Sequence, residues 1–264
     1  MKKILALLLA AVLVLGMAAC AASPAAPTQT TSDTASDASD TPASNAETPA
    51  ASSGAKLRFV TGGESGTYYA FGGVLASFVS GKSNCKVTAL TSGGSQANVE
   101  DLTNGNVQLA FVQSDVMNYA YNGQRLFDSP VTGFSVVAQL YQEQVQIVTT
   151  NPDIKTVADL AGKKVSIGAA GSGVYFNAID VLSAYDLKES DISAVYQSFG
   201  DSAESLKDGK IDAAFIVAGA PTTAITDLAT AGSVYLVSLD DSHVQSLLSA
   251  SPYYTAATIK AGTY

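Results

Sequence analysis

Residues 57–80 read LRFVTGGESGTYYAFGGVLASFVS, and this stretch decides the fold class. The first four residues predict a strand, the glycine-rich segment after them predicts a loop, and residues 67–80 predict a helix. The same order of strand, small-residue loop and helix recurs at 86–104 and at 108–121. Such repetition is typical of an α/β fold with a parallel sheet.

A second set of strands and helices follows. We expect strands at 135–141, 145–149, 164–167, 194–197, 213–217 and 234–239. Helices are expected at 174–185, near 203–206, and after Ala218-Gly219-Ala220-Pro221, with the proline in the first turn. Because the two sets are of similar size, the sequence predicts two α/β lobes.

The first twenty residues have the pattern of an export signal. Lys2 and Lys3 precede an apolar run from Ile4 to Ala19, which is shorter than the roughly 20 residues that a spanning helix needs. The junction Met17-Ala18-Ala19-Cys20 resembles the bacterial lipobox, in which cleavage leaves a lipidated cysteine as the first residue. We therefore expect a signal peptide over 1–19 and a lipid anchor at Cys20. An ordinary secretory signal with a chance cysteine is the alternative.

Residues 20–55 form a segment of different composition. From Ala21 to Ala55 there is no Leu, Ile, Val, Phe, Tyr, Lys or Arg. Such a segment cannot bury enough apolar surface to offset the entropy of the chain. We expect a disordered segment rich in Ala, Ser, Thr and Pro, which is either a tether that lets the folded part stand off the membrane or a spacer of no mechanistic importance.

Composition excludes several classes of function. The 264 residues carry 14 Lys+Arg against 23 Asp+Glu, a formal net charge of -9, which argues against nucleic-acid binding. One His and two Cys are too few for most zinc sites, so we expect neither a metal nor another cofactor.

Three stretches resemble catalytic or nucleotide-binding motifs, and each lacks a required feature. Residues 76–83 fit a relaxed Walker A pattern but lie at the end of an expected helix. Gly171-Ser172-Gly173 begins like a dinucleotide fingerprint, but Phe176 stands where the third glycine belongs. Gly63-Glu64-Ser65-Gly66 is one residue short of a nucleophile elbow. The single imidazole, His243, is expected at a surface helix start. We expect no catalysis.

Five strand-to-helix junctions carry glycine or small polar residues instead. In open α/β sheets, ligands bind beyond the carboxyl ends of the strands, where helix N-termini attract anions. Neither Arg58 nor Arg125 lies in such a loop, so amides and hydroxyls would hold a carboxylate. The candidate ligand-binding residues in these loops are Gly63, Ser65, Ser92, Gly94, Ser95, Gln113, Ser114, Ser172, Gly173, Gly219 and Pro221. The alternative is that glycine and serine only form turns and helix caps, as Ser95 is expected to do.

Two further residues complete the expected site. Tyr68, the second residue of the first expected helix, would pack on the carbon chain of a ligand. Glu143, near the presumed hinge, would meet an amino group or would remain a solvated hinge residue.

Several of these motifs together resemble the TAXI family, the solute receptors of TRAP transporters. The matching segments are Thr61-Gly62-Gly63 with Gly66-Thr67-Tyr68-Tyr69, Thr91-Ser92-Gly93-Gly94-Ser95 with Asn98, Gln113-Ser114-Asp115, Tyr141 with Glu143, residues 157–163, Gly171-Ser172-Gly173, residues 209–213 and Gly219-Ala220-Pro221. The resemblance implies a class II periplasmic-binding-protein-like fold whose two lobes close on a solute such as glutamate or 2-oxoglutarate. It also implies TRAP membrane subunits as partners, driven by an ion gradient.

The resemblance also predicts how the chain is divided. We expect residues 56–140 to form the first part of lobe 1, residues 141–238 to form lobe 2, and residues 239–264 to return to lobe 1. Family members continue past the position of Tyr264, so lobe 1 is expected to be incomplete at its C-terminal end. The predicted function is an extracytoplasmic solute receptor, anchored by lipid to the outer face of the bacterial cell membrane. The alternatives are a solute-binding protein of an ABC importer for an anion, a sulfonate or a thiamine precursor, and an exported enzyme on the same fold.

Overall fold

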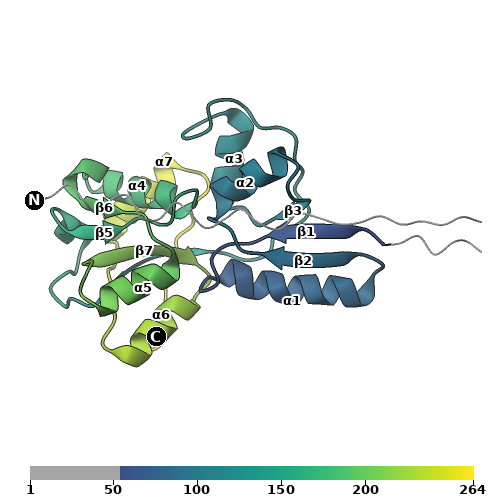
Figure 1. Ribbon diagram of the computed structural model, residues 1–264. Helices are drawn as coiled ribbons and strands as arrows, with labels where there is room; N and C mark the ends of the chain where they lie inside the picture. Colours follow the sequence, from purple (N-terminus) through teal and green to yellow (C-terminus); the bar gives the residue numbers. More distant parts are fainter. Residues whose placement is uncertain (1–53) are drawn as a thin grey trace, which may run out of the picture. The chain divides into compact units, whose positions relative to one another are not determined.

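The computed structural model describes residues 54–264 (Figure 1). The expected signal peptide, the lipidation site Cys20 and all but the last two residues of the expected tether lie outside these described residues. Within 54–264, no helix is both long enough and apolar enough to cross a bilayer.

Lobe 1 contains a three-stranded parallel sheet in the order β2-β1-β3. Its strands are β1 (Lys56–Val60), β2 (Lys86–Leu90) and β3 (Leu109–Ala110), and its helices are α1 (Thr67–Lys82), α2 (Ser95–Thr103) and α3 (Ser114–Asn122). Each helix follows a strand through one of the predicted small-residue loops. The loops therefore all lie at the carboxyl ends of the parallel strands.

Lobe 2 contains a five-stranded sheet in the order β6-β5-β7-β4-β8. Its strands are β4 (Gln144–Thr149), β5 (Lys164–Ser166), β6 (Ser193–Val195), β7 (Ala213–Ala218) and β8 (Tyr235–Leu236). Its helices are α4 (Val174–Ala184), α5 (Phe199–Lys207), α6 (Thr223–Ala231) and α7 (Asp241–Ala250), with short 3-10 turns η1 (Val157–Leu160) and η2 (Glu189–Asp191). The sheet is mixed, because β4 runs antiparallel to both β7 and β8. In each lobe the three parallel strands are arranged with the first of them in the middle, β2-β1-β3 in lobe 1 and β6-β5-β7 in lobe 2. Two α/β lobes of this kind confirm the predicted fold class.

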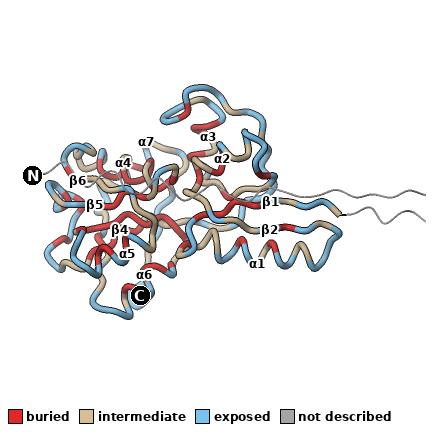
Figure 2. Tube along the Cα trace, in the orientation of Figure 1, coloured by how far each residue is buried: buried red, intermediate tan, exposed pale blue. Residues whose placement is uncertain are grey.

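The core of lobe 2 is organised around β7, whose six residues are all buried (Figure 2). Ala213, Phe215 and Val217 pack in one cluster with residues of α4 and α7. The alternating residues, Ala214 and Ile216 among them, pack in a second cluster with residues of α5 and α6. A continuous apolar run is what a strand with helices on both faces requires. Figure 1 shows α5 and α6 together beside β7.

Lobe 1 has a smaller core, and one buried amide aligns its loops. Phe59, Val87 and Phe111 pack beneath α1, in which only Gly72 and Ala76 are buried. On α2, the fully buried Asn98 donates hydrogen bonds of 2.7 Å to the carbonyls of Thr61 and Phe111. This side chain ties the carboxyl ends of β1 and β3 together and so fixes the first and third loops.

The strand expected at 135–141 is absent, and the segment is irregular in the structure. Val136 and Val137 are 64% and 86% exposed. In lobe 2 the corresponding last strand, β8, pairs with the antiparallel strand β4. No such strand lies beside 135–141 in the described part of the chain. The apolar pattern alone does not make a strand, because a strand needs a neighbour for its backbone hydrogen bonds.

The last segment, 239–264, packs on lobe 2, which differs from the expected return to lobe 1. Leu247 of α7 and Tyr254 belong to the core cluster that contains α4. The hydroxyl of Tyr264 accepts a hydrogen bond from the backbone N–H of Thr222 at 3.0 Å. On the lobe 1 side, the ring of Tyr253 lies 6.4 Å from that of Tyr119. Apolar positions in this segment are thus buried by the larger core.

Candidate functional site

A cavity of about 70 Å³ lies where the loops of the two lobes meet. Nine of the predicted ligand-binding residues line it, namely Gly63, Tyr68, Ser92, Gly94, Ser95, Gln113, Glu143, Ser172 and Gly173. Residues after β6, Ser198 and Phe199, also line the cavity and are absent from the sequence-based set. The structure thus brings loops from three strands of lobe 1 and from β5 of lobe 2 to one place.

The other four predicted residues, Ser65, Ser114, Gly219 and Pro221, do not line the cavity. The carbonyl of Ser65 accepts a hydrogen bond from Ala224 N at 3.2 Å, and that of Gly219 accepts one from Thr67 Oγ1 at 3.3 Å. Both carbonyls therefore join the lobes beside the cavity. Ser114 and Pro221 are exposed. Pro221 also precedes the N-cap of α6, Thr222, instead of standing in the first turn.

Ser95 has a different role from the helix cap that the sequence suggests. The N-cap of α2 is Gly94, and Ser95 is the first helical residue, 1% exposed. Its hydroxyl accepts a hydrogen bond from Gln113 N at 3.0 Å. The side-chain amide of Gln113 in turn donates to Asn177 Oδ1 on α4 at 2.7 Å. A chain of hydrogen bonds therefore runs from the second loop through the third loop into lobe 2.

The second loop of lobe 1 touches the glycine loop of lobe 2 directly. Ala97 N donates to the carbonyl of Gly171 at 3.0 Å. A Cβ atom on Gly93 would lie 2.6 Å from the carbonyl oxygen of Ala170, and one on Gly173 would lie 1.6 Å from Gln113 Oε1. Glycine at position 93 is therefore needed for close approach between the backbones of the two lobes, whereas a side chain at position 173 would displace the side-chain amide of Gln113.

Four helices begin at residues that line the cavity. These first residues are Thr67 of α1, Ser95 of α2, Val174 of α4 and Phe199 of α5. No Lys or Arg is among the residues that line the cavity in the part of the chain that the structure describes. Peptide N–H groups at helix N-termini attract anions, so the cavity can hold a negative group without a cationic side chain.

Glu143 lies in the segment that leads into β4. The Tyr68 hydroxyl donates to Glu143 Oε2 at 3.0 Å. Burial raises the pKa of Glu143 to about 8; the Tyr68 hydrogen bond opposes this rise and the Asp115 carboxylate adds to it. Burial and the nearby Glu143 carboxylate likewise raise the pKa of Tyr68 well above its ordinary value. Without a cation beside it, the Glu143 carboxyl is therefore mostly protonated at pH 7.

Outside the cavity, residues in the first turn of α4 pack against lobe 1. Phe176 is 1% exposed and packs in a cluster with residues of α2 and α3, including Val116 and Tyr119. Beside it, Asn177 Nδ2 donates to Asp115 Oδ2 at 2.9 Å. In the sequence, Phe176 only interrupts a fingerprint, and no local pattern points to Asn177. A large apolar residue three positions after a glycine loop is the signal that points to the Phe176 contact.

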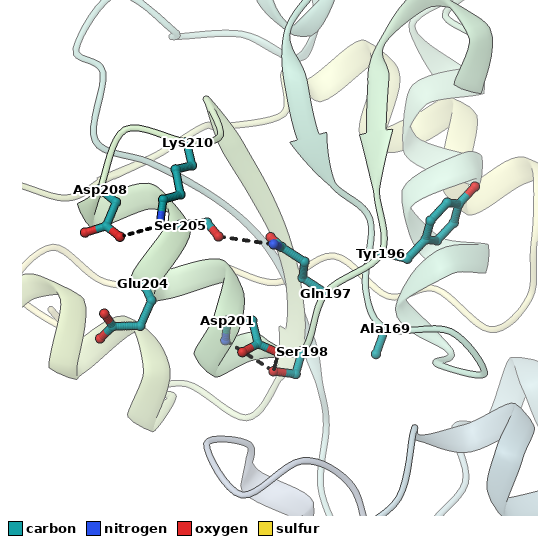
Figure 3. Close-up of a pocket in the computed structure, with 9 residues that line it drawn as sticks. All are labelled: Ala169, Tyr196, Gln197, Ser198, Asp201, Glu204, Ser205, Asp208 and Lys210. Carbon is teal, nitrogen blue, oxygen red and sulfur yellow. Dashed lines mark hydrogen bonds and ion pairs between the residues drawn. The ribbon is translucent and has the colours of Figure 1, made fainter. Parts of the chain in front are cut away.

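On the surface of lobe 2, an open groove of about 500 Å³ adjoins the cavity (Figure 3). Ala169 and Ser198 line both. Figure 3 shows the carboxylates of Asp201, Glu204 and Asp208 at the groove. Among residues 54–264, no cluster of His, Cys, Asp and Glu has an arrangement that could hold a metal ion.

The two lobes with a shared cavity define a fold of the periplasmic-binding-protein type. A solved structure from Bordetella bronchiseptica shares this fold, with 19% identity, a TM-score of 0.52, and coverage of 70% of this chain and 57% of that chain. The model of the NMT1-like family matches residues 59–264, and the chain belongs to this family.

Two other solved structures show weaker likeness. One is the alkanesulfonate-binding protein SsuA from Xanthomonas axonopodis pv. citri bound to MOPS, with 22% identity, a TM-score of 0.47, and coverage of 71% of this chain and 62% of that chain. The other is the amino acid ABC transporter substrate-binding protein AbpA from Streptococcus pneumoniae bound to L-arginine, with 17% identity, a TM-score of 0.48, and coverage of 69% and 74%. The chain spans 57% to 62% of the length of the Bordetella and Xanthomonas proteins.

Proposed function

We propose that this protein is the solute receptor of a bacterial importer and performs no chemistry on its solute. The observation that carries the proposal is the cavity, whose lining combines glycine and serine loops and helix N-termini from both lobes. Such a lining suits a small metabolite with an anionic group, either an anion or a zwitterion. Membership of the NMT1-like family agrees with this function.

Binding would require the lobes to part. The cavity of about 70 Å³ is well below the roughly 300–1,000 Å³ of typical ligand pockets. The loop contact between Ala97 and Gly171 must therefore open before a solute enters. The solute would then favour whichever arrangement of the lobes binds it better.

The test of the site is binding by the full-length protein. We expect one solute from a panel of amino acids, dicarboxylates and sulfonates to raise the unfolding midpoint in a saturable way. Changing Ser92 and Ser172 together to Ala should weaken its affinity about tenfold, because each hydroxyl supplies a hydrogen bond. Unchanged affinity in the double variant would show that the solute binds elsewhere.

The class of importer is a separate part of the proposal. One of the weaker structural neighbours is an ABC transporter substrate-binding protein, which favours the ABC alternative over the TRAP assignment. The likeness of the loops to TAXI motifs favours TRAP subunits. Uptake of labelled solute by membranes that contain the cognate partner separates the two: ABC uptake requires ATP, whereas TRAP uptake stops when the ion gradient is collapsed.

We also propose that the protein is extracytoplasmic and is held at the membrane by a lipid on Cys20. The lipobox-like junction supports this location. In the native host, Cys20→Ser should release the protein from the membrane fraction and abolish incorporation of labelled fatty acid. Retention of both in the variant would show that the lipid is not attached to Cys20.

A further inference from the structure

Glu143 is the sole carboxylate among the described residues that line the cavity. Its Oε2 atom accepts the hydrogen bond from Tyr68. Within residues 54–264, no other hydrogen bond to this carboxyl group is present, so Oε1 remains free to meet a solute. A carboxylate in a desolvated site is strongly unfavourable unless a cation or several donors compensate it.

Within the part of the chain that the structure describes, no such cation is present beside Glu143. The titratable groups that face Glu143 are Tyr68 on α1, Tyr141 in its own segment and Asp115 on α3. From the neighbouring strand β7, the cavity receives the apolar residues Val217 and Ala218. Every titratable group around Glu143 is thus neutral or negative, which leaves the compensating charge to the solute.

A second oxygen atom beside Glu143 lacks a hydrogen-bond partner. The hydroxyl of Tyr141 is buried and has no partner among the described residues, and it lies near enough to Glu143 for that carboxylate to raise its pKa. A buried polar atom of this kind requires an explanation, and a hydroxyl oxygen can accept a hydrogen bond. An ammonium group has three donors.

The groove beside the cavity has the complementary charge for such a solute. Its lining contains Asp201, Glu204 and Asp208 (Figure 3). Lys210 pairs with Asp208 at 2.8 Å and Lys207 pairs with Glu204 at 2.9 Å, so Asp201 is the carboxylate of the groove that has no cationic partner among the described residues. This negative charge beside the cavity attracts ammonium groups and opposes dianions. The anionic end of a zwitterion would still be held by the helix N-termini inside.

We propose that Glu143 determines specificity by pairing with a protonated amine, so that the solute is a zwitterion, an amino acid or an aminosulfonate, instead of a dianion. This proposal rests on the proposed function as a solute receptor. It deepens that function by naming the chemical group that the receptor must find on its solute.

The pairing has a consequence for protons. Because burial raises the pKa of Glu143 to about 8, pairing with an ammonium group expels a proton from the carboxyl. Linkage then predicts release of about 0.9 proton per solute bound at pH 7. The affinity should rise roughly tenfold from pH 6 to pH 7 and level off above pH 8.

The experiment is titration calorimetry of the full-length protein with two matched pairs of solutes. Glutamate and 2-oxoglutarate differ by an amine in place of a keto group, and taurine and ethanesulfonate differ by an amine alone. Each solute is titrated into the wild type, Glu143→Gln and Glu100→Gln. Glu100 is exposed on α2, so its variant removes the same charge away from the cavity. Repeating the titration in buffers of different ionisation enthalpy counts the protons released.

We expect the aminated member of at least one pair to bind about 100-fold more tightly than its partner. Glu143→Gln should reduce this preference to less than about fivefold and abolish proton release, whereas Glu100→Gln changes neither. If Glu143→Gln does not fold, the pH profile and proton count of the wild type still decide the question.

Two results would overturn the proposal, and they are distinguishable. If 2-oxoglutarate binds as tightly as glutamate, or affinity falls above pH 8, the protonated carboxyl donates to an anionic group; the receptor function then stands without the amine. If neither pair nor any member of the wider panel binds, the solute-receptor function itself is wrong and the proposal falls with it.

Discussion

The two lobes follow the same order of strands and helices, yet one sheet has three strands and the other has five. The two extra strands are β4, which lies between β7 and β8 and runs antiparallel to both, and β8, which pairs with β4. With β4 in place, β7 is a buried central strand. Beside β3, no such strand is present among the described residues, and 135–141 stays irregular. The comparison shows that a further strand such as β8 forms only where an antiparallel strand such as β4 lies beside the third parallel strand and offers it backbone hydrogen bonds.

The largest expected effect comes from the centre of the larger sheet. Phe215 on β7 is 0% exposed, whereas Val74 on α1 is 67% exposed. Phe215→Ala should lower the free energy of unfolding by about 3–5 kcal/mol, and Val74→Ala by less than about 0.5 kcal/mol. Denaturant unfolding measures both. Similar losses for the two variants would show that α1 is covered in solution.

The next effect concerns the contact between the lobes. Phe176 lies on α4 of lobe 2 but packs in the core cluster of lobe 1. Phe176→Ala should cost about 3 kcal/mol and should let the lobes separate, since an apolar interface holds them together. Chemical denaturation gives the first quantity and small-angle X-ray scattering gives the second. An unchanged radius of gyration would mean that the loop contacts alone keep the lobes together.

A pH dependence follows from Glu143, which stands between the lobes. Its pKa in the folded protein, about 8, exceeds the ordinary 4.5. The folded state therefore binds this proton more tightly, and stability is lost as the pH rises from about 4.5 to 8. Between about pH 5.5 and about pH 7.5 we expect a loss of about 2–3 kcal/mol in the solute-free wild type and none from this group in Glu143→Gln. Unfolding at a series of pH values checks this; parallel profiles for the two proteins would contradict it.

A smaller effect is expected at Tyr264. Its hydroxyl hydrogen-bonds to the buried Gln146 and accepts from Thr222 N. Tyr264→Phe removes one hydroxyl and should lower the unfolding free energy by about 1–2 kcal/mol, because the two buried groups lose their partner. Tyr121→Phe is the matched control, as Tyr121 is 53% exposed on lobe 1. Equal thermal midpoints for both variants would place the last residue away from lobe 2.

The smallest effect comes from comparing the loss of unfolding free energy at β8 of lobe 2 with that at segment 135–141 of lobe 1. Leu236 on β8 pairs with Val148 and packs against a core cluster, whereas Val137 is 86% exposed. Leu236→Ser should cost about 1–2 kcal/mol, and Val137→Ser less than about 0.5 kcal/mol. Thermal unfolding resolves the two. A clear loss for Val137→Ser would indicate that 135–141 has a partner in solution.

The inner part of each lobe was predictable because its signals are local. A strand, a glycine loop and a helix follow one another within about 25 residues, as in 57–80. The helix α1 and the loop that ends at Gly66 therefore lie where the sequence places them. The cavity residues Ser92 and Ser172 were found in the same way, since loops at the carboxyl ends of neighbouring strands converge.

What the sequence did not reveal depends on contacts between distant residues. Segment 135–141 has a strand-like composition, but strand formation depends on a neighbouring strand. The hydrogen bond from Gln113 to Asn177 joins residues 64 positions apart, and no local pattern predicts it. Ser95 resembles a cap in sequence, yet the backbone of Gly94, with a φ of 120°, starts the helix one residue earlier. In each case tertiary structure overrides local preference.

The hydrogen bond between Ala97 N and the carbonyl of Gly171 joins the lobes through main-chain atoms alone. The hydroxyls of Ser92 and Ser172, by contrast, belong to side chains that line the cavity beside it. Under the proposed function, closing the lobes and recognising the solute are therefore carried by different atoms. Replacing the serines by other small residues would then change which solute binds while the hydrogen bond between Ala97 and Gly171 stays in place.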